Sequence, residues 1–232
     1  MEPIETKLLN SGRLNEYPLF KKFCMLKEKG LRRESFKELT LFIEEANQWN
    51  DEDQMDFALW LFTLLEDSDD VHFVLVHPLE EHLLKPILSK WIEHFPSDSR
   101  PYRWHGLFLQ SEESRGHLQK AWELGGSSEQ LCLVKLIDFN IDSLWDSTHH
   151  LSEDLYLGDV QEDTNTIMET YELNASVQDL QVKQNVKLEL QHYKELLKNW
   201  TAFTKERKEG FVQWCEEKGK NDPGVKAYYY EQ

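Results

Sequence analysis

The sequence is poor in cysteine and has no long apolar run. Its three cysteines, Cys24, Cys132 and Cys215, are odd in number and far apart, and no CxxC pair occurs. This usage argues against a disulfide framework and a structural zinc site, and it favours a reducing compartment. No segment approaches a membrane-spanning length, and the start MEPIETKLLNSG lacks the basic and apolar regions of a secretory signal. We therefore expect a soluble, cytoplasmic protein with no membrane segment.

Positive charge is missing from two long stretches. Residues 38–84 contain 13 acids and residues 136–182 contain 11, and neither stretch has a lysine or an arginine. The whole chain has 26 basic and 43 acidic side chains, which gives a formal charge of −17. Such an excess repels a phosphate backbone, so we expect no nucleic acid as a direct ligand. The charge pattern favours a basic protein or peptide as the partner.

Recognisable catalytic motifs are also absent from the sequence. There is no GxSxG nucleophile elbow, and no cysteine stands in a catalytic context. The Gly125-Gly126 pair lacks the lysine and the hydroxyl residue of a phosphate-binding loop, and it is more typical of a helix end. We therefore expect a non-catalytic protein that needs no cofactor.

Helical spacing is what the sequence has in abundance. Apolar residues recur at intervals of three and four between residues 20 and 46, and Gly30 is placed to end the first of two helices there. Their short connection predicts an antiparallel pair. The next helix is expected to start near Asn50 or Asp51, whose side chains can cap free amides. The run VHFVLV at 71–76 is either a strand or a buried approach to the following helix.

A resemblance to a known family lies within residues 102–124. It is carried by Trp104, Gly106, Leu109, Leu118 and the run Ala121-Trp122-Glu123-Leu124. This pattern is similar to a tetratricopeptide-repeat hairpin, in which a small residue packs between two helices. The interval from Gly106 to Ala121 is about four residues shorter than in the consensus repeat, and Gly126 stands where the closing proline usually falls. The resemblance implies an all-α fold of antiparallel αα-hairpins in an irregular array.

The last third of the sequence predicts a long amphipathic helix within residues 176–218. Its apolar residues recur at intervals of three and four, and Gly210 is expected to separate it from a short helix. This long helix either packs against its own domain or binds a second copy, as a homodimer contact. We expect a helical-hairpin array at residues 1–174, and a C-terminal helix and tail at 175–232 that pack on it, with a single domain as the alternative.

The two cation-free stretches supply the expected binding surface. In a helical array, segments far apart in the sequence can share one face, so the stretches predict a groove that attracts a basic ligand. Such a protein would act as an adaptor or neutralise a basic toxin, with tryptophans as anchors. The expected binding residues are Trp49, Asp51, Asp53, Asp56, Trp145, Asp154, Asp159 and Asp163. The alternative is that both stretches are solvated faces that serve only solubility.

A different function is suggested by residues 148–163, THHLSEDLYLGDVQED, where two histidines precede a cluster of acids. Histidine and carboxylate side chains bind metals, so a metal-dependent hydrolase is the second hypothesis. Its candidate ligands are His149, His150, Glu153 and Asp154. If a helix continues through this segment, the two histidines point about 100° apart. Either histidine can instead cap a helix C-terminus.

Overall fold

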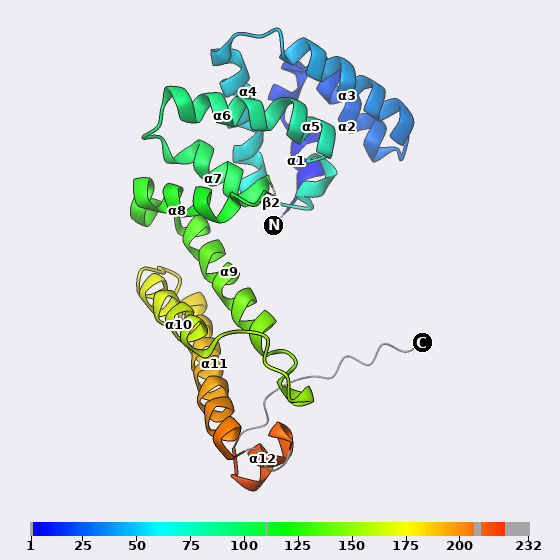
Figure 1. Ribbon diagram of the computed structural model, residues 1–232. Helices are drawn as coiled ribbons and strands as arrows, with labels where there is room; N and C mark the ends of the chain where they lie inside the picture. Colours follow the sequence, from blue (N-terminus) through cyan, green and yellow to red (C-terminus); the bar gives the residue numbers. More distant parts are fainter. Residues whose placement is uncertain (1, 110, 207–209, 221–232) are drawn as a thin grey trace. The chain divides into compact units, whose positions relative to one another are not determined.

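The chain has an all-α fold, as the sequence predicts (Figure 1). The computed structural model describes residues 2–109, 111–206 and 210–220. The chain divides into two compact units, Met1–Gly126 and Ser127–Gln232, and the described residues of each unit are considered by themselves. The expected boundary after residue 174 differs from this division. It falls inside the second unit, at the turn between two helices that pack along each other.

The first unit is built almost entirely from short and medium helices. In chain order its elements are β1 (Glu2–Pro3), α1 (Ile4–Asn10), a 3₁₀ turn (Gly12–Glu16), α2 (Pro18–Glu28), α3 (Arg32–Ala46), α4 (Asp51–Glu66), β2 (Ser68–Asp69), a 3₁₀ turn (Val71–Phe73), α5 (His77–Leu79), a π-helical turn (Glu80–Leu84), α6 (Lys85–His94), α7 (Ser99–Phe108) and α8 (Ser114–Gly125). The two-residue strands β1 and β2 pair in parallel.

Local sequence signals explain several helix ends in this unit. Gly30 follows α2 with a φ of 72°, a left-handed conformation that glycine adopts without strain. Asn50 caps α4, because its Oδ1 accepts a hydrogen bond from the Asp53 amide at 2.9 Å. The candidate strand at 71–76 is wrong. The segment begins with a 3₁₀ turn and then buries Val74 and Leu75, so it is the approach to α5.

The passage from α5 to α6 has its own local cause. Pro86 has no amide hydrogen, so the carbonyl of His82, four residues earlier, loses its usual helical partner. The chain forms a π-helical turn just before this proline. The Asn47 side chain donates a hydrogen bond to the freed His82 carbonyl at 3.3 Å, which partly satisfies it. A helix that a proline would otherwise break therefore continues.

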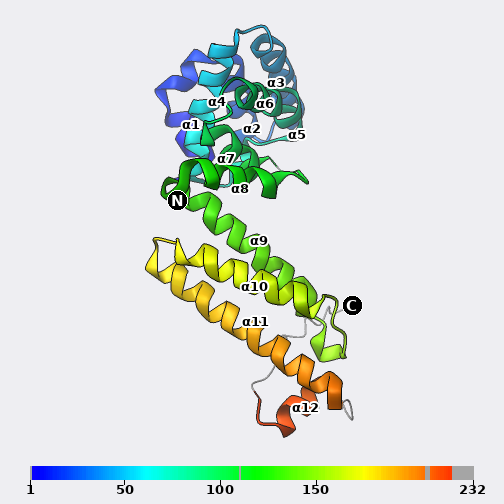
Figure 2. The ribbon, with the colours of Figure 1, turned by 60° about the vertical axis from the view of Figure 1, so that its left-hand side comes forward.

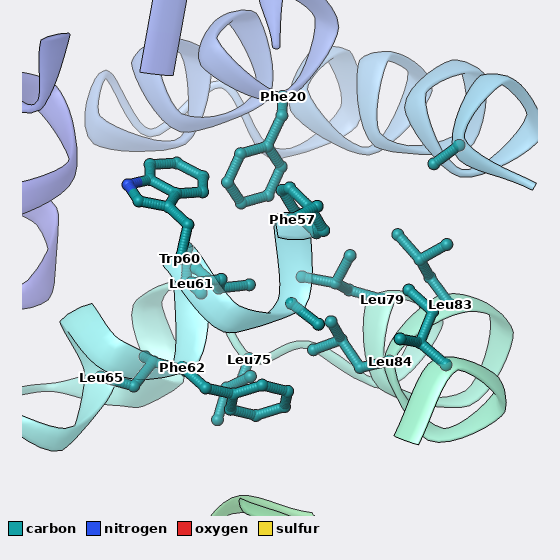
Figure 3. Packing of buried hydrophobic residues seen from close by; sticks show 14 of the residues in the cluster. Phe20, Phe57, Trp60, Leu61, Phe62, Leu65, Leu75, Leu79, Leu83 and Leu84 are labelled. Carbon is teal, nitrogen blue, oxygen red and sulfur yellow. The ribbon is translucent and has the colours of Figure 1, made fainter. Parts of the chain in front are cut away.

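An aromatic cluster forms the core of the first unit (Figure 3). Phe20 of α2 and Phe57 of α4 meet edge to face, with ring centroids 5.4 Å apart. Trp60 extends the cluster, and Leu79 lines its other side. Aromatic pairs in this geometry add to the free energy gained by burying their apolar surface.

Helices α7 and α8 pack unusually closely at Gly106. A Cβ atom at this position would lie 2.5 Å from Cγ of Leu118 and 3.0 Å from its backbone nitrogen. Only glycine permits this approach. The small residue expected between the two helices is therefore present, while the tetratricopeptide resemblance as a whole stays a prediction.

The second unit consists mainly of three long helices. A 3₁₀ turn (Gly126–Ser128) spans the boundary between the units, and the following elements are α9 (Gln130–Thr148), a 3₁₀ turn (Leu151–Glu153), α10 (Val160–Ala175), α11 (Leu180–Glu206) and α12 (Phe211–Glu217). Helices α9, α10 and α11 lie side by side (Figure 2). The predicted long helix corresponds to α11, and Gly210 precedes the short helix α12 as expected.

The interior of the second unit combines apolar and polar contacts. One face of α11 is buried within this chain, and the buried residues of that face include Leu190, Leu197 and Phe203. Between α9 and α10, the fully buried Asn140 donates a hydrogen bond from Nδ2 to Oγ1 of Thr170 at 3.0 Å. Such a buried pair fixes the register of the two helices, because sliding would leave polar groups unpaired. No helix in the described residues is both long and apolar enough to cross a membrane.

Candidate functional site

Residues 149–159 form a loop between α9 and α10 that folds back on the end of α9. The Leu157 amide donates to the carbonyl of Ser147 at 3.0 Å, and the Leu155 amide donates to the carbonyl of His150 at 3.2 Å. Asp154 adopts the left-handed conformation, with a φ of 59°, where the chain reverses. The helix ends at Thr148, so the helical geometry assumed for this segment does not apply.

Asp163 is buried under this loop and is not a surface acid. Its side chain accepts hydrogen bonds from Oη of Tyr156 at 2.6 Å and from Oγ of Ser147 at 3.1 Å. Gly158 lies against the same group, and a Cβ there would come within 2.7 Å of Asp163 Oδ2. Burial, the hydrogen bond to Asp163 and the charges of Asp163 and Asp159 raise the pKa of Tyr156. With an exposed fraction of only 5%, Asp163 holds the loop on the helices.

The other two expected acids of this segment accept hydrogen bonds from amides at the N-termini of helices. Asp159 caps α10 by accepting the amides of Gln161 and Glu162 at 2.8 and 3.0 Å. Asp154 accepts the amide of Phe211 at 2.5 Å, at the first residue of α12. Both side chains remain exposed, but each already satisfies free amides where the helix dipole favours a negative charge.

The expectation that the two histidines diverge is wrong. The rings of His149 and His150 lie 4.1 Å apart between centroids, and His149 also stacks on Trp145 at 4.2 Å. Nδ1 of His149 lies 3.1 Å from the carbonyl oxygen of Trp145 and 3.0 Å from that of Asp146. Because carbonyls only accept hydrogen bonds, this nitrogen must carry a proton. His149 therefore caps the end of α9.

The remaining proposed metal ligands make local contacts. Nδ1 of His150 lies 3.0 Å from Oε1 of Glu153. In the part of the chain that the structure describes, no group of three or more histidine, cysteine, aspartate or glutamate side chains is arranged to hold a metal ion. The metal-dependent hydrolase stays a prediction, with no observation that favours it.

The expected binding residues of the first unit also have partners within the chain. Asp51 forms an ion pair with Lys90 at 3.0 Å, and Asp56 forms one with Arg13. The Asp53 carboxylate accepts a hydrogen bond from Asn50 at the start of α4. These cations come from outside residues 38–84, so a stretch without cations in the sequence is not free of them in space. Folding pairs two of these acids.

The two proposed tryptophan anchors differ in exposure. Trp49 is half-buried and belongs to the aromatic core, with its ring 5.7 Å from that of Phe42. The Trp145 side chain is 50% exposed and lies in the second unit against His149. Of the two, Trp145 is therefore the one available to a partner.

The second unit brings together acids that are not among the expected binding residues. Asp138 and Asp142 lie one turn apart on α9, and their charges act on Glu189 of α11. We call these three residues the carboxylate patch. Helices α9 and α11 meet in the second unit, which is why acids about fifty residues apart in the sequence come together.

The side chains of the carboxylate patch are partly shielded from water, and their negative charges repel one another. Partial burial raises the pKa of Asp138, with Lys135 opposing and Asp142 adding to the effect. Burial also raises the pKa of Glu189, and the charges of Asp138 and Asp142 contribute while that of His192 opposes. Like charges close together disfavour the ionised form in this way.

A neighbouring tyrosine responds to the same charges. Burial, Glu189 and Asp142 raise the pKa of Tyr193 to about 12. The carboxylate patch is therefore a concentrated negative potential on the surface of one unit.

The spacing of Asp138 and Asp142 inside the second cation-free stretch was a usable signal for two of the three residues of this patch. Glu189 lies beyond that stretch, in a segment rich in lysine. Its contribution depends on how α11 packs, which no local pattern reveals.

No protein-family model, curated protein or solved structure matches this chain.

Proposed function

We propose that the protein is a non-catalytic interaction module that captures a basic protein or peptide on the acidic surface of its second unit. The meeting of Asp138 and Asp142 of α9 with Glu189 of α11 carries this proposal, and the raised pKa of Asp138 and of Glu189 accords with it. Partial burial makes the ionised form of these carboxyls costly and their like charges add to that cost, so a cationic side chain that pairs with them lowers their free energy.

The position of the carboxylate patch supports the same function. Asp138, Asp142 and Glu189 are all exposed enough to meet a partner. By contrast Asp51 and Asp56 already have cations, and Asp163 is buried. We therefore propose that the partner contacts the carboxylate patch, and not the acids that the sequence led us to expect.

The test compares two variants with the same change in net charge. One carries Asp138→Asn, Asp142→Asn and Glu189→Gln. The control carries Glu44→Gln, Glu45→Gln and Glu93→Gln, at exposed acids of the first unit. Fluorescence anisotropy measures the affinity of each for a labelled polyarginine peptide at low and at high salt.

We expect the patch variant to bind about tenfold more weakly at low salt, which corresponds to three exposed charge pairs of about 0.5 kcal/mol each. The control should lose less than about twofold, and its affinity should keep the salt dependence of the unchanged protein. Equal losses in both variants would mean that only net charge matters, and the solubility hypothesis would then replace this proposal.

A further inference from the structure

A long groove lies between α10 and α11, apart from the carboxylate patch. It has a volume of about 640 Å³. On α10 its lining residues are spaced by four, four and three, through Val160, Thr164, Met168 and Tyr171. The helices run side by side here (Figure 2), so the groove follows about three helical turns, a length of roughly 17 Å at 1.5 Å per residue.

The floor of the groove is apolar and open to solvent. Ile167 and Leu197 are buried at its base, while the side chain of Met168 is 59% exposed. Methionine adapts its shape to different apolar partners, and it is common at surfaces that bind helices. An exposed methionine above a buried apolar floor indicates a surface that a partner covers.

One edge of the groove is basic, in a protein whose net charge is −17. Lys194, Lys198 and Lys205 of α11 are all exposed and line it. Among the described residues none of the three forms an ion pair or a side-chain hydrogen bond. We call this feature the lysine groove.

The other titratable groups of the groove leave this charge in place. Glu206 lines one end, but its carboxylate already pairs with Lys218 at 2.9 Å and accepts the Trp214 indole hydrogen bond at 3.1 Å. Tyr171 is the remaining titratable lining group. The edge formed by α10 contributes no cation, so positive charge follows one side only.

We propose that the lysine groove binds an amphipathic helix of a partner protein, one whose apolar face is bordered along one edge by carboxylates. A channel about three turns long between two neighbouring helices is the shape into which the side chains of a third helix pack. The three lysines then require acids on one edge of that helix. This surface differs from the carboxylate patch in both place and charge, so the inference does not depend on the proposed function.

Two other occupants fit the groove less well. A symmetric pairing of two copies through it would bring two sets of three lysines together, at a cost in repulsion. A lipid surface could supply negative charge, but an apolar floor recessed between two helices cannot insert into a flat bilayer.

The test uses the full chain and two synthetic helical peptides with the same leucine face. One peptide carries glutamates along one edge, spaced four and seven residues apart to match the three lysines, and the other carries lysines there. The sequence has four methionines, so labelling their methyl groups with carbon-13 gives a sparse NMR spectrum. Met168 reports on the groove, while Met25 and Met55 of the first unit serve as internal references.

We expect the acidic peptide to shift the Met168 signal and leave that of Met25 in place, and the basic peptide to shift neither. A variant with Lys194→Gln, Lys198→Gln and Lys205→Gln should bind the acidic peptide about tenfold more weakly. A matched control with Lys29→Gln, Lys37→Gln and Lys187→Gln removes the same charge at exposed lysines outside the groove, and its affinity should change less than about twofold.

Three results would overturn the inference. The first is a Met168 signal that responds to neither peptide or to both equally. The second is binding of anionic vesicles that requires the three lysines in a protein that shows no preference for the acidic peptide. The third is self-association in sedimentation that the same three substitutions abolish, which would make a second copy the occupant.

Discussion

At the scale of single residues, Gly106 and Asp163 determine local packing in a way that their residue types alone do not predict. Gly106 allows α7 and α8 to touch, and Asp163 of α10 holds the loop of residues 149–159 on the helices. A glycine and an acid would often be interpreted as a flexible point and a solvated charge. Here both are parts of the packed interior, and their substitution should act on stability.

The first prediction concerns Gly106→Ala. The added methyl group would overlap Leu118, including its backbone nitrogen, so the two helices must separate. We expect the free energy of unfolding to fall by about 1–3 kcal/mol, the usual cost of overpacking. Urea denaturation followed by tryptophan fluorescence measures it.

Gly116→Ala, on the outer face of α8, is the matched control. No atom lies within 4 Å of a Cβ at that position. Alanine should stabilise the helix there by about 0.5–1 kcal/mol, because glycine is the poorer helix former. Equal effects of the two substitutions would contradict the close approach at Gly106.

At the scale of elements, α11 carries two different surfaces. Glu189 belongs to the carboxylate patch shared with α9, while Lys194 borders the groove shared with α10. The separation of five residues places these two side chains about 140° apart around the helix axis. One helix thus presents opposite charges to its two neighbours.

The carboxylate patch should cost stability in the free protein, and the second prediction measures this cost. Asp142→Asn removes one charge that acts on Glu189 and Tyr193. We expect the free energy of unfolding to rise by about 0.3–0.5 kcal/mol at low salt, and the gain to shrink as salt screens the repulsion. Asp146→Asn, one turn further along α9, is the control and should change it less. A destabilised Asp142→Asn protein would show that the acids do not repel one another.

Helix positions were largely predictable from the sequence because their signals are local. The spacing of apolar residues predicts α11, and Asn50, Gly30 and Gly210 mark helix ends through their own backbone and side-chain chemistry. The candidate strand at 71–76 was wrong because a short β-branched segment can be buried without forming a strand.

The candidate site was much less predictable, because it depends on contacts between distant segments. Asp51 and Asp56 looked free in the sequence, yet Lys90 and Arg13 reach them in the fold. Glu189 looked like part of a basic segment, yet it joins acids of another helix. A run of acids in a sequence forms an acidic surface only where the fold brings no basic side chains to it.

At the scale of the whole molecule, the two units differ in how protons affect them. In the first unit, burial lowers the pKa of His105 from 6.5 to about 4, with the neighbouring His117 adding to the effect. The pKa of Asp98 is also lowered, because hydrogen bonds from Arg100 outweigh the opposing effect of burial. In the second unit, the raised pKa of Asp138 and of Glu189 has the opposite sign.

These directions predict that the first unit is the more labile in acid. Between pH 6.5 and about 4, His105 is protonated in the unfolded chain but neutral in the native state. Its contribution therefore lowers the free energy of unfolding as pH falls, by up to about 3 kcal/mol. Asp98 adds a loss as pH falls, since its native carboxylate must be protonated. Asp138 and Glu189 do the reverse, because the native state binds protons there first.

The methionine methyl signals follow the two units separately during an acid titration. We expect Met25 and Met55 to lose their native positions at a higher pH than Met168. His105→Phe, which removes the titrating ring, should move the transition of the first unit to lower pH and leave Met168 unaffected. Loss of all three signals at one pH, or loss of Met168 first, would contradict this prediction.

The double role of α11 also has a thermodynamic consequence. If a ligand on the α9 side favours one orientation of this helix, the same orientation sets the position of Lys194, Lys198 and Lys205 relative to α10. Linkage is reciprocal. If a basic ligand changes the affinity for an acidic helix by some factor, the acidic helix changes the affinity for the basic ligand by the same factor. A single helix would then make the occupancy of one surface a reporter of the other.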